Sequence, residues 1–379
     1  MKKIWGLVLS VVLTLGCAFS TYANTIPRVY LNNNKMLLQN SPFSQNGCNY
    51  IPLRALADNI GATLKWGSSD STITMTYGTN NIEMRINDAE IHINSSITNL
   101  EEPPILKDGV AYAPVSFIKD ALGADVTYYA PDNQIYISLD LPKEDGQVYD
   151  SYGRLERTTN LPSNASKFSY ILNSVPNSMY SDIEFYQDKH SWEITPVEGI
   201  NYLYPNKISS DPWATPSNIE SCKKLFEKNL ELRLNVSYRT VTDSWINNLT
   251  QTYPTGWWEG WKYKDGNYSS KYPKELKKYV QYLKDNHLAI EGDYYVEPST
   301  ANMSVGTYSM RCWVRFRINS DKVSTAKLYD GVQDVSLDTN TWYSGYTDLS
   351  CFDDSMYSDG SDITMEHDYM YFGSITAEN

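Results

Sequence analysis

The chain has 379 residues and a hydrophobic content of 41%, which allows two or three globular domains and excludes a disordered protein. Its 45 acidic residues outnumber 32 basic ones, giving a formal net charge of −13. Binding to a nucleic-acid backbone needs clustered Lys and Arg, so this balance argues against nucleic acid. It favours neutral polymers, cations or other proteins as partners.

The first 23 residues have the pattern of a secretory signal peptide. Two lysines precede an apolar run over residues 4–15, and a candidate cleavage site ends at Ala23. The run is too short for a typical membrane span, and no later stretch is apolar enough to cross a membrane. A lipoprotein signal ending at Cys17 is an alternative, although Thr14 stands where such signals usually carry Leu. We therefore expect a secreted or cell-wall-associated protein.

Four cysteines remain after cleavage: Cys48, Cys222, Cys312 and Cys351. An even number in a secreted chain permits two disulfides, with three possible pairings. We favour Cys312–Cys351, because both residues lie in the C-terminal segment. Four unpaired thiols are the alternative.

The segment from Asn46 to Trp66 recurs 62 positions later, from Asp108 to Tyr128, without a gap. The recurring residues are Gly47/Gly109, Tyr50/Tyr112, Pro52/Pro114, Gly61/Gly123 and Ala62/Ala124. Self-similarity at a fixed spacing indicates an internal duplication. It sets the architecture of this part of the chain but not a reaction.

Each copy predicts a hairpin turn, an extended step, a short helix and a strand. The Asn-Gly and Asp-Gly dipeptides favour hairpin turns, each Pro fits the first turn of a helix, and the second Gly of each copy fits a left-handed helix cap. Apolar residues recur between them at helical spacing: Leu53, Leu56, Ala57 and Ile60, then Val115, Ile118 and Leu122. We expect an α+β domain over residues 27–140, with mostly antiparallel sheet and two short helices packed on it.

The pattern N-G-x-x-Y-I-P-L-R, followed by G-A and Trp66, resembles the copper amine oxidase N-terminal-like, or stalk, family. The second copy departs from it, with Ser116 in place of the Arg and Tyr128 in place of the Trp. The resemblance implies two tandem copies in residues 27–140 and a place on the envelope of a Gram-positive bacterium. It implies neither copper nor amine oxidation here. No Asn-Tyr pair is followed by an acidic residue and the four His are scattered, so we expect no cofactor.

A polar, turn-rich linker is expected over residues 141–152, followed by a second α+β domain over 153–379. Helices are predicted at 217–234, 242–249 and 273–286, and strands at 289–296 and 308–318. In the last of these, Met310, Cys312, Val314, Phe316 and Ile318 alternate with Arg311, Trp313, Arg315 and Arg317.

Two loops in this region are candidate binding sites. One holds the aromatic residues Trp257, Trp258, Trp261 and Tyr263, which would stack on sugar rings or else fill a core beneath the loop. The other holds the carboxylates Asp353, Asp354, Asp359 and Asp362, which would bind Ca²⁺ or else form a solvated acidic turn. Its spacing does not fit an EF-hand.

The remaining charged clusters are weaker candidates. Glu366-His367-Asp368 has the composition of an acid–base cluster, but in a strand His367 faces away from its two neighbours. The arginines of the alternating strand would bind an anionic polymer or form the solvent-facing side of a sheet.

We therefore weigh two functions. The first is a secreted, non-enzymatic protein, in which the duplicated domain attaches a C-terminal binding domain to a cell-wall polymer or another envelope protein. The alternative is a secreted hydrolase of wall glycan or peptide. It requires two convergent carboxylates, to be sought among Glu259, Glu291, Asp293, Asp353 and Glu366.

Overall fold

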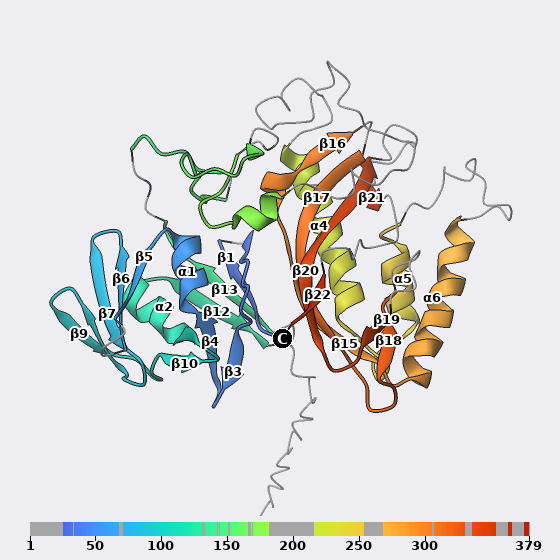
Figure 1. Ribbon diagram of the computed structural model, residues 1–379, viewed down its shortest axis with the longest axis horizontal. Helices are drawn as coiled ribbons and strands as arrows, with labels where there is room; N and C mark the ends of the chain where they lie inside the picture. Colours follow the sequence, from blue (N-terminus) through green and yellow to red (C-terminus); the bar gives the residue numbers. More distant parts are fainter. Residues whose placement is uncertain are drawn as a thin grey trace, which may run out of the picture.

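The computed structural model places two mixed α and β bodies side by side, with a connecting segment across one edge of both (Figure 1). The N-terminal domain is blue to teal, the connecting segment green, and the C-terminal domain yellow to red. The structure describes residues 26–32, 34–67, 71–130, 133–141, 143, 145–150, 152–165, 168, 170–181, 216–253, 268–304, 307–329, 336–353, 363–365 and 375–378. Within them no helix is long and apolar enough to cross a membrane.

Three sheets form the N-terminal domain, with strand orders β12-β13-β1-β2, β10-β11-β4-β3 and β5-β6-β7-β8-β9. The strands are β1 (Arg28–Leu31), β2 (Asn34–Lys35), β3 (Phe43–Gln45), β4 (Cys48–Pro52), β5 (Thr63–Gly67), β6 (Thr72–Tyr77), β7 (Asn80–Arg85), β8 (Glu90–Ile93), β9 (Ser96–Asn99), β10 (Ile105–Lys107), β11 (Val110–Pro114), β12 (Asp125–Tyr129) and β13 (Gln134–Ser138). β1 and β13 run parallel, whereas the other pairs in these sheets are antiparallel. β6 and β7 form an antiparallel hairpin.

Two helices of eight residues pack on these sheets: α1 (Leu53–Ile60) and α2 (Val115–Leu122). Each follows a proline and ends at a glycine, Gly61 or Gly123, whose φ of 72° lies in the left-handed region. Glycine adopts this conformation without the steric cost of a Cβ, so the predicted helix ends are confirmed. The helices bury Leu53, Leu56, Ala57 and Ile60 in α1, and Phe117, Ile118, Ala121 and Leu122 in α2.

The connecting segment has little regular structure beyond the short 3₁₀ turn η3 (Asn177–Tyr180) and two isolated bridges. Its apolar side chains form a cluster that includes Leu37 of the N-terminal domain and Tyr295 and Trp313 of the C-terminal domain. The segment is therefore packed against both domains, with Tyr180 fully buried.

The C-terminal domain is built on a sheet of order β14-β15-β17-β20-β21, to which β16 and β22 add at β17 and β20. The strands are β14 (Val236–Ser237), β15 (Ala289–Val296), β16 (Asn302–Ser304), β17 (Thr307–Asn319), β20 (Trp342–Asp353), β21 (Ile363–Met365) and β22 (Thr376–Ala377), with a separate hairpin of β18 (Thr325–Lys327) and β19 (Ser336–Asp338). The helical elements are α4 (Pro216–Leu234), α5 (Asp243–Thr250), α6 (Tyr268–Asp285) and the 3₁₀ turn η6 (Pro298–Thr300).

The three helices predicted for this region are α4, α5 and α6, and the strands predicted at 289–296 and 308–318 are β15 and β17. The third helix begins at Tyr268, five residues before its predicted start, and contains Pro273. Pro273 is the sixth residue of this helix and lies beyond the four N-terminal N–H groups that have no intrahelical acceptor, so it removes one hydrogen bond of the helix.

The alternation predicted for β17 separates the two faces of this sheet. Met310, Cys312, Val314, Phe316 and Ile318 are buried in one core with residues of α4, α5 and α6. The odd-numbered side chains face the connecting segment and the N-terminal domain, where Trp313 is buried in the cluster around Tyr180. Both faces of the sheet are thus covered by protein.

Candidate functional site at the domain junction

Most of the loop residues predicted as sites lie outside the described residues. Trp257, Trp258, Trp261 and Tyr263 do so, as do Asp354, Asp359 and Asp362, together with the 366–368 cluster. Asp353 ends β20, and only its backbone is described. Among the described residues, no group of three or more His, Cys, Asp or Glu side chains could hold a metal ion.

The arginines of β17 form ion pairs within the protein, so neither interpretation offered by the sequence describes them. Arg311 makes two hydrogen bonds of 2.8 Å to the Asp348 carboxylate. Arg315 binds Glu378 with its Nη2 at 2.7 Å and reaches Ser41 of the N-terminal domain with Nη1 at 2.8 Å. Arg311 and Arg315 therefore hold β17 against its neighbours.

Two of the five carboxylates considered for hydrolysis are likewise paired. Glu291 accepts a hydrogen bond of 2.9 Å from Nε of Arg317. Asp293 accepts one of 2.5 Å from Lys35 Nζ. Glu259 and Glu366 lie outside the described residues, and the Asp353 side chain is not described.

The predicted Cys312–Cys351 disulfide does not fit the strand register. Cys312 lies opposite Thr347, four residues along β20 from Cys351. At about 3.3 Å per residue this separates the two cysteines by about 13 Å, whereas a disulfide needs Cα atoms within about 7 Å. The Sγ atom of Cys351 instead lies 2.9 Å from that of Cys222 on α4. No disulfide is formed among the described cysteines, and Cys222 and Cys351 are two whose sulfur atoms are in contact.

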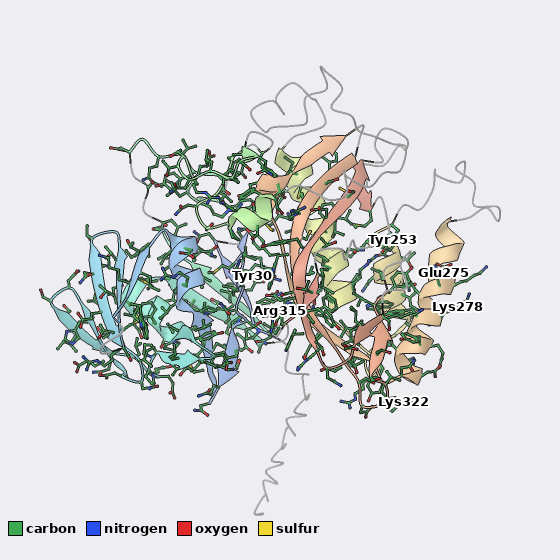
Figure 2. All side chains as sticks on the ribbon, in the orientation of Figure 1. Tyr30, Tyr253, Glu275, Lys278, Arg315 and Lys322 are labelled. Carbon is green, nitrogen blue, oxygen red and sulfur yellow. The ribbon has the colours of Figure 1, made fainter. Side chains whose placement is uncertain are left out.

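Ion pairs join the N-terminal domain directly to the C-terminal domain. Lys35 on β2 contacts Asp293 on β15, with side chains only 2% and 6% exposed, and its ammonium lies 3.6 Å from the centre of the Tyr294 ring. Arg28 on β1 pairs with Glu231 on α4 at 2.5 Å. Figure 2 shows this boundary between the labels of Tyr30 and Arg315. The junction is therefore a polar interface with buried charge.

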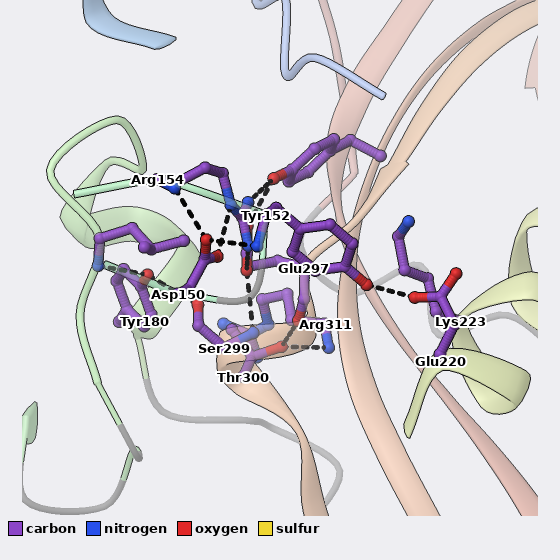
Figure 3. A network of polar contacts seen from close by, with 12 residues as sticks. Asp150, Tyr152, Arg154, Tyr180, Glu220, Lys223, Glu297, Ser299, Thr300 and Arg311 are labelled. Carbon is purple, nitrogen blue, oxygen red and sulfur yellow. Dashed lines mark hydrogen bonds and ion pairs between the residues drawn. The ribbon is translucent and has the colours of Figure 1, made fainter. Parts of the chain in front are cut away.

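A second buried network fixes the connecting segment to the C-terminal domain (Figure 3). Arg154 donates to Asp150 at 2.7 Å and forms two hydrogen bonds with the Glu297 carboxylate at 2.9 and 3.1 Å. Glu297 also accepts hydrogen bonds from the Tyr295 hydroxyl at 2.5 Å and the Ser299 amide at 2.8 Å. Every oxygen of this buried carboxylate is thus occupied.

The ionisation of Glu297 depends on these partners. Burial alone would raise its pKa, but the charge of Arg154 and the hydrogen bonds from Arg154, Tyr295 and the Ser299 amide hold that pKa below its usual value. Glu297 is therefore a stable carboxylate that anchors the segment. A buried group serving as a general acid would need the opposite shift.

Two adjoining pockets open where the connecting segment meets the N-terminal domain. The first has a volume of about 220 Å³ and lies between α1 and the segment. The second has a volume of about 300 Å³ and extends toward β5 and β6. Their shared walls are Asp58, Asn59, Asn173 and Ser174. Burial raises the pKa of Asp58, and the nearby Arg54 partly opposes that shift.

Exposed aromatic rings are the other notable feature of the N-terminal domain. Trp66 on β5 is 45% exposed, and Tyr128 and Tyr129 on β12 are each 49% exposed. The sequence marks Trp66 and Tyr128 as matching positions, but it does not reveal that both rings face solvent. Trp side chains are highly buried on average, so the exposure of Trp66 is informative.

Comparison with known proteins finds a family match for the N-terminal part of the chain. The family model of the copper amine oxidase N-terminal domain matches residues 30–137. This portion of the chain is therefore similar to that family, as its sequence pattern indicates. No curated protein and no solved structure matches the chain significantly.

Proposed function

We propose that this is a secreted or cell-envelope-associated protein without enzymatic activity, in which the N-terminal domain attaches the C-terminal binding domain to a cell-wall polymer. The observation that carries the proposal is the exposure of Trp66 and Tyr128 at equivalent positions. Trp66 lies opposite Ile73, and Tyr128 lies opposite Ile135, again 62 positions further on. Each ring lies on the same face of its strand pair as a buried isoleucine and is about half exposed at that position.

The pairing of β4 with β11 supports two tandem copies. Tyr50 lies opposite Pro114, and Pro52 lies opposite Tyr112. In the repeat, Pro114 corresponds to Pro52 and Tyr112 corresponds to Tyr50. The two strands therefore make equivalent contacts with each other, as expected for two similar units related by an approximate twofold axis. Two copies would present two aromatic sites, and simultaneous engagement raises the overall affinity for a polymer.

The chemistry of the rings and the charge of the chain favour a neutral glycan. Flat aromatic faces offer apolar area and hydrogen-bonding tips to sugar rings. A net charge of −13 disfavours an anionic polymer at long range. The buried pair of Lys35 and Asp293 would give the C-terminal domain a fixed orientation relative to this attachment surface.

Sedimentation with purified cell wall tests the proposal. The triple variant Trp66→Ala, Tyr128→Ala, Tyr129→Ala is expected to bind at least about tenfold more weakly, since each ring contributes about 0.5–1.5 kcal/mol. The control is Ile97→Ala with Leu106→Ala, which removes exposed aliphatic side chains from the same domain. Undiminished binding by the triple variant, or an equal loss in the control, would refute the attachment surface.

A further inference from the structure

We infer that the pocket between α1 and the connecting segment binds a small carboxylate through the guanidinium of Arg157. The pocket is separate from the aromatic residues proposed to bind the wall polymer, so this inference does not rest on that function. Three observations carry it: the state of the Arg157 side chain, the composition of the walls and the balance of charge.

The backbone of Arg157 is fixed, but two of its guanidinium nitrogens have no partner among the described residues. Its backbone N–H donates to the Ile171 carbonyl at 2.6 Å. Two guanidinium nitrogens, Nε and Nη2, are shielded from solvent, and neither has a hydrogen-bond partner among the described residues. Buried donors without acceptors cost free energy, and the cost is larger for a charged group. An anion that reached these two nitrogens from the pocket, which Arg157 lines, would remove that cost.

Arg154, three residues earlier, is an arginine with a structural role and provides a comparison for Arg157. Its guanidinium is paired with both Asp150 and Glu297. Arg157 lies on the same segment and lines the pocket instead. The contrast is that no described residue supplies an acceptor to Nε or Nη2 of Arg157, so a bound anion can supply one.

The walls of the pocket suit a small polar ligand. Amide side chains surround it, and Leu37, Val175 and Pro176 add apolar surface; the amides are Gln39, Asn40, Asn59 and Asn173. Amides donate and accept hydrogen bonds, which allows them to orient a ligand that carries a peptide-like group. The adjoining pocket of about 300 Å³ gives room for such a ligand to extend.

The charges favour a singly charged, planar anion. Arg54 and Arg157 line the pocket against the single carboxylate of Asp58. The Nε and Nη2 edge of a guanidinium matches the two oxygens of a carboxylate in a bidentate pair. One unpaired arginine with a nearby acid is a weaker match for a doubly charged phosphate. A small carboxylate with an adjacent amide, such as an acylated amino acid, therefore fits best.

Calorimetric titration of the full chain with N-acetylalanine tests the inference. We expect saturable binding, and at least about a tenfold weaker affinity for Arg157→Gln, because a bidentate charge-assisted pair is lost. The matched control is Arg85→Gln, an exposed arginine of the same charge outside this pocket. It should bind as the unaltered protein does.

A second readout separates a ligand site from a structural role. Since Nε and Nη2 of Arg157 have no partner among the described residues, Arg157→Gln without ligand should have an unchanged or higher melting temperature. A marked fall in melting temperature would overturn the inference, because it would assign Arg157 to the fold. The inference also fails if N-acetylalanine does not bind, if the uncharged N-acetylalaninamide binds equally well, or if inorganic phosphate binds more tightly.

Discussion

Lys35 Nζ lies 2.5 Å from Asp293 Oδ1, and this nearly inaccessible ion pair joins residues 258 positions apart on the two domains. Two buried charges are expensive to remove from water, and their attraction offsets that cost only while both are present. The pair therefore couples the stability of the domain junction to each partner.

Replacing Lys35 with Met tests that coupling. The variant leaves Asp293 buried without its partner, so we expect a loss of about 3–5 kcal/mol in the free energy of unfolding, measured by urea denaturation. The double variant Lys35→Met with Asp293→Asn should recover much of the loss, because no charge is then buried alone. Lys65→Met, at an exposed position on β5, is the control and should change stability by less than about 0.5 kcal/mol.

Glu297 predicts a dependence of stability on acid. Its pKa in the folded protein lies below the unfolded value of about 4.3, so folding favours the carboxylate form. The stabilisation is fully present above that unfolded pKa and disappears as pH falls through the lower folded pKa. We expect the free energy of unfolding to fall with acid more steeply in the unaltered protein than in Glu297→Gln. Parallel pH curves for the two proteins would contradict this role.

Oxidation is expected to join Cys222 to Cys351. With oxidised glutathione as the acceptor, the two thiols lose two protons and two electrons, and the glutathione disulfide is reduced to two thiols. The bond closes a loop of more than 100 residues and should stabilise the protein by about 3–5 kcal/mol. Peptide mapping by mass spectrometry under non-reducing conditions identifies the bond.

The cysteine variants provide the controls. Cys222→Ser should abolish the thermal stabilisation produced by oxidation, whereas Cys48→Ser should preserve it, because Cys48 lies in the other domain. A cross-linked peptide containing Cys312 and Cys351 would instead restore the pairing favoured by the sequence.

Local features of this fold follow from the sequence because their causes are local. Proline before α1 and glycine after it define that helix through backbone conformation alone. The alternation of β17 predicts which residues enter the core with α4. These signals act over a few residues, so they do not depend on which other parts of the chain pack against them.

The partners of charged residues cannot be predicted from the sequence, because they come from distant parts of the chain. Nothing near Lys35 indicates that its partner is Asp293. The arginines of β17 present a basic row in the sequence, but acids 26 to 63 positions away neutralise them. The Cys312–Cys351 pairing favoured by the sequence does not fit the register of β17 and β20, because register, and not proximity in sequence, decides which side chains meet.

The unpaired edge of Arg157 is also invisible in the sequence. Arg154 and Arg157 are three positions apart and carry the same charge, yet among the residues that the structure describes only Arg154 pairs with carboxylates. A sequence reports the presence of a donor, whereas the assembled walls determine whether an acceptor reaches it.

The parallel pairing of β1 with β13 bears on how the chain folds as it is made. Arg28 in the first strand of the domain lies opposite Gln134 in the last. Synthesis proceeds from the N-terminus, so β1 must wait for more than 100 further residues before this edge is satisfied. Closing so long a loop is slow. We expect residues 48–114 to fold first and the β1 edge to close last, as the final step in forming this domain.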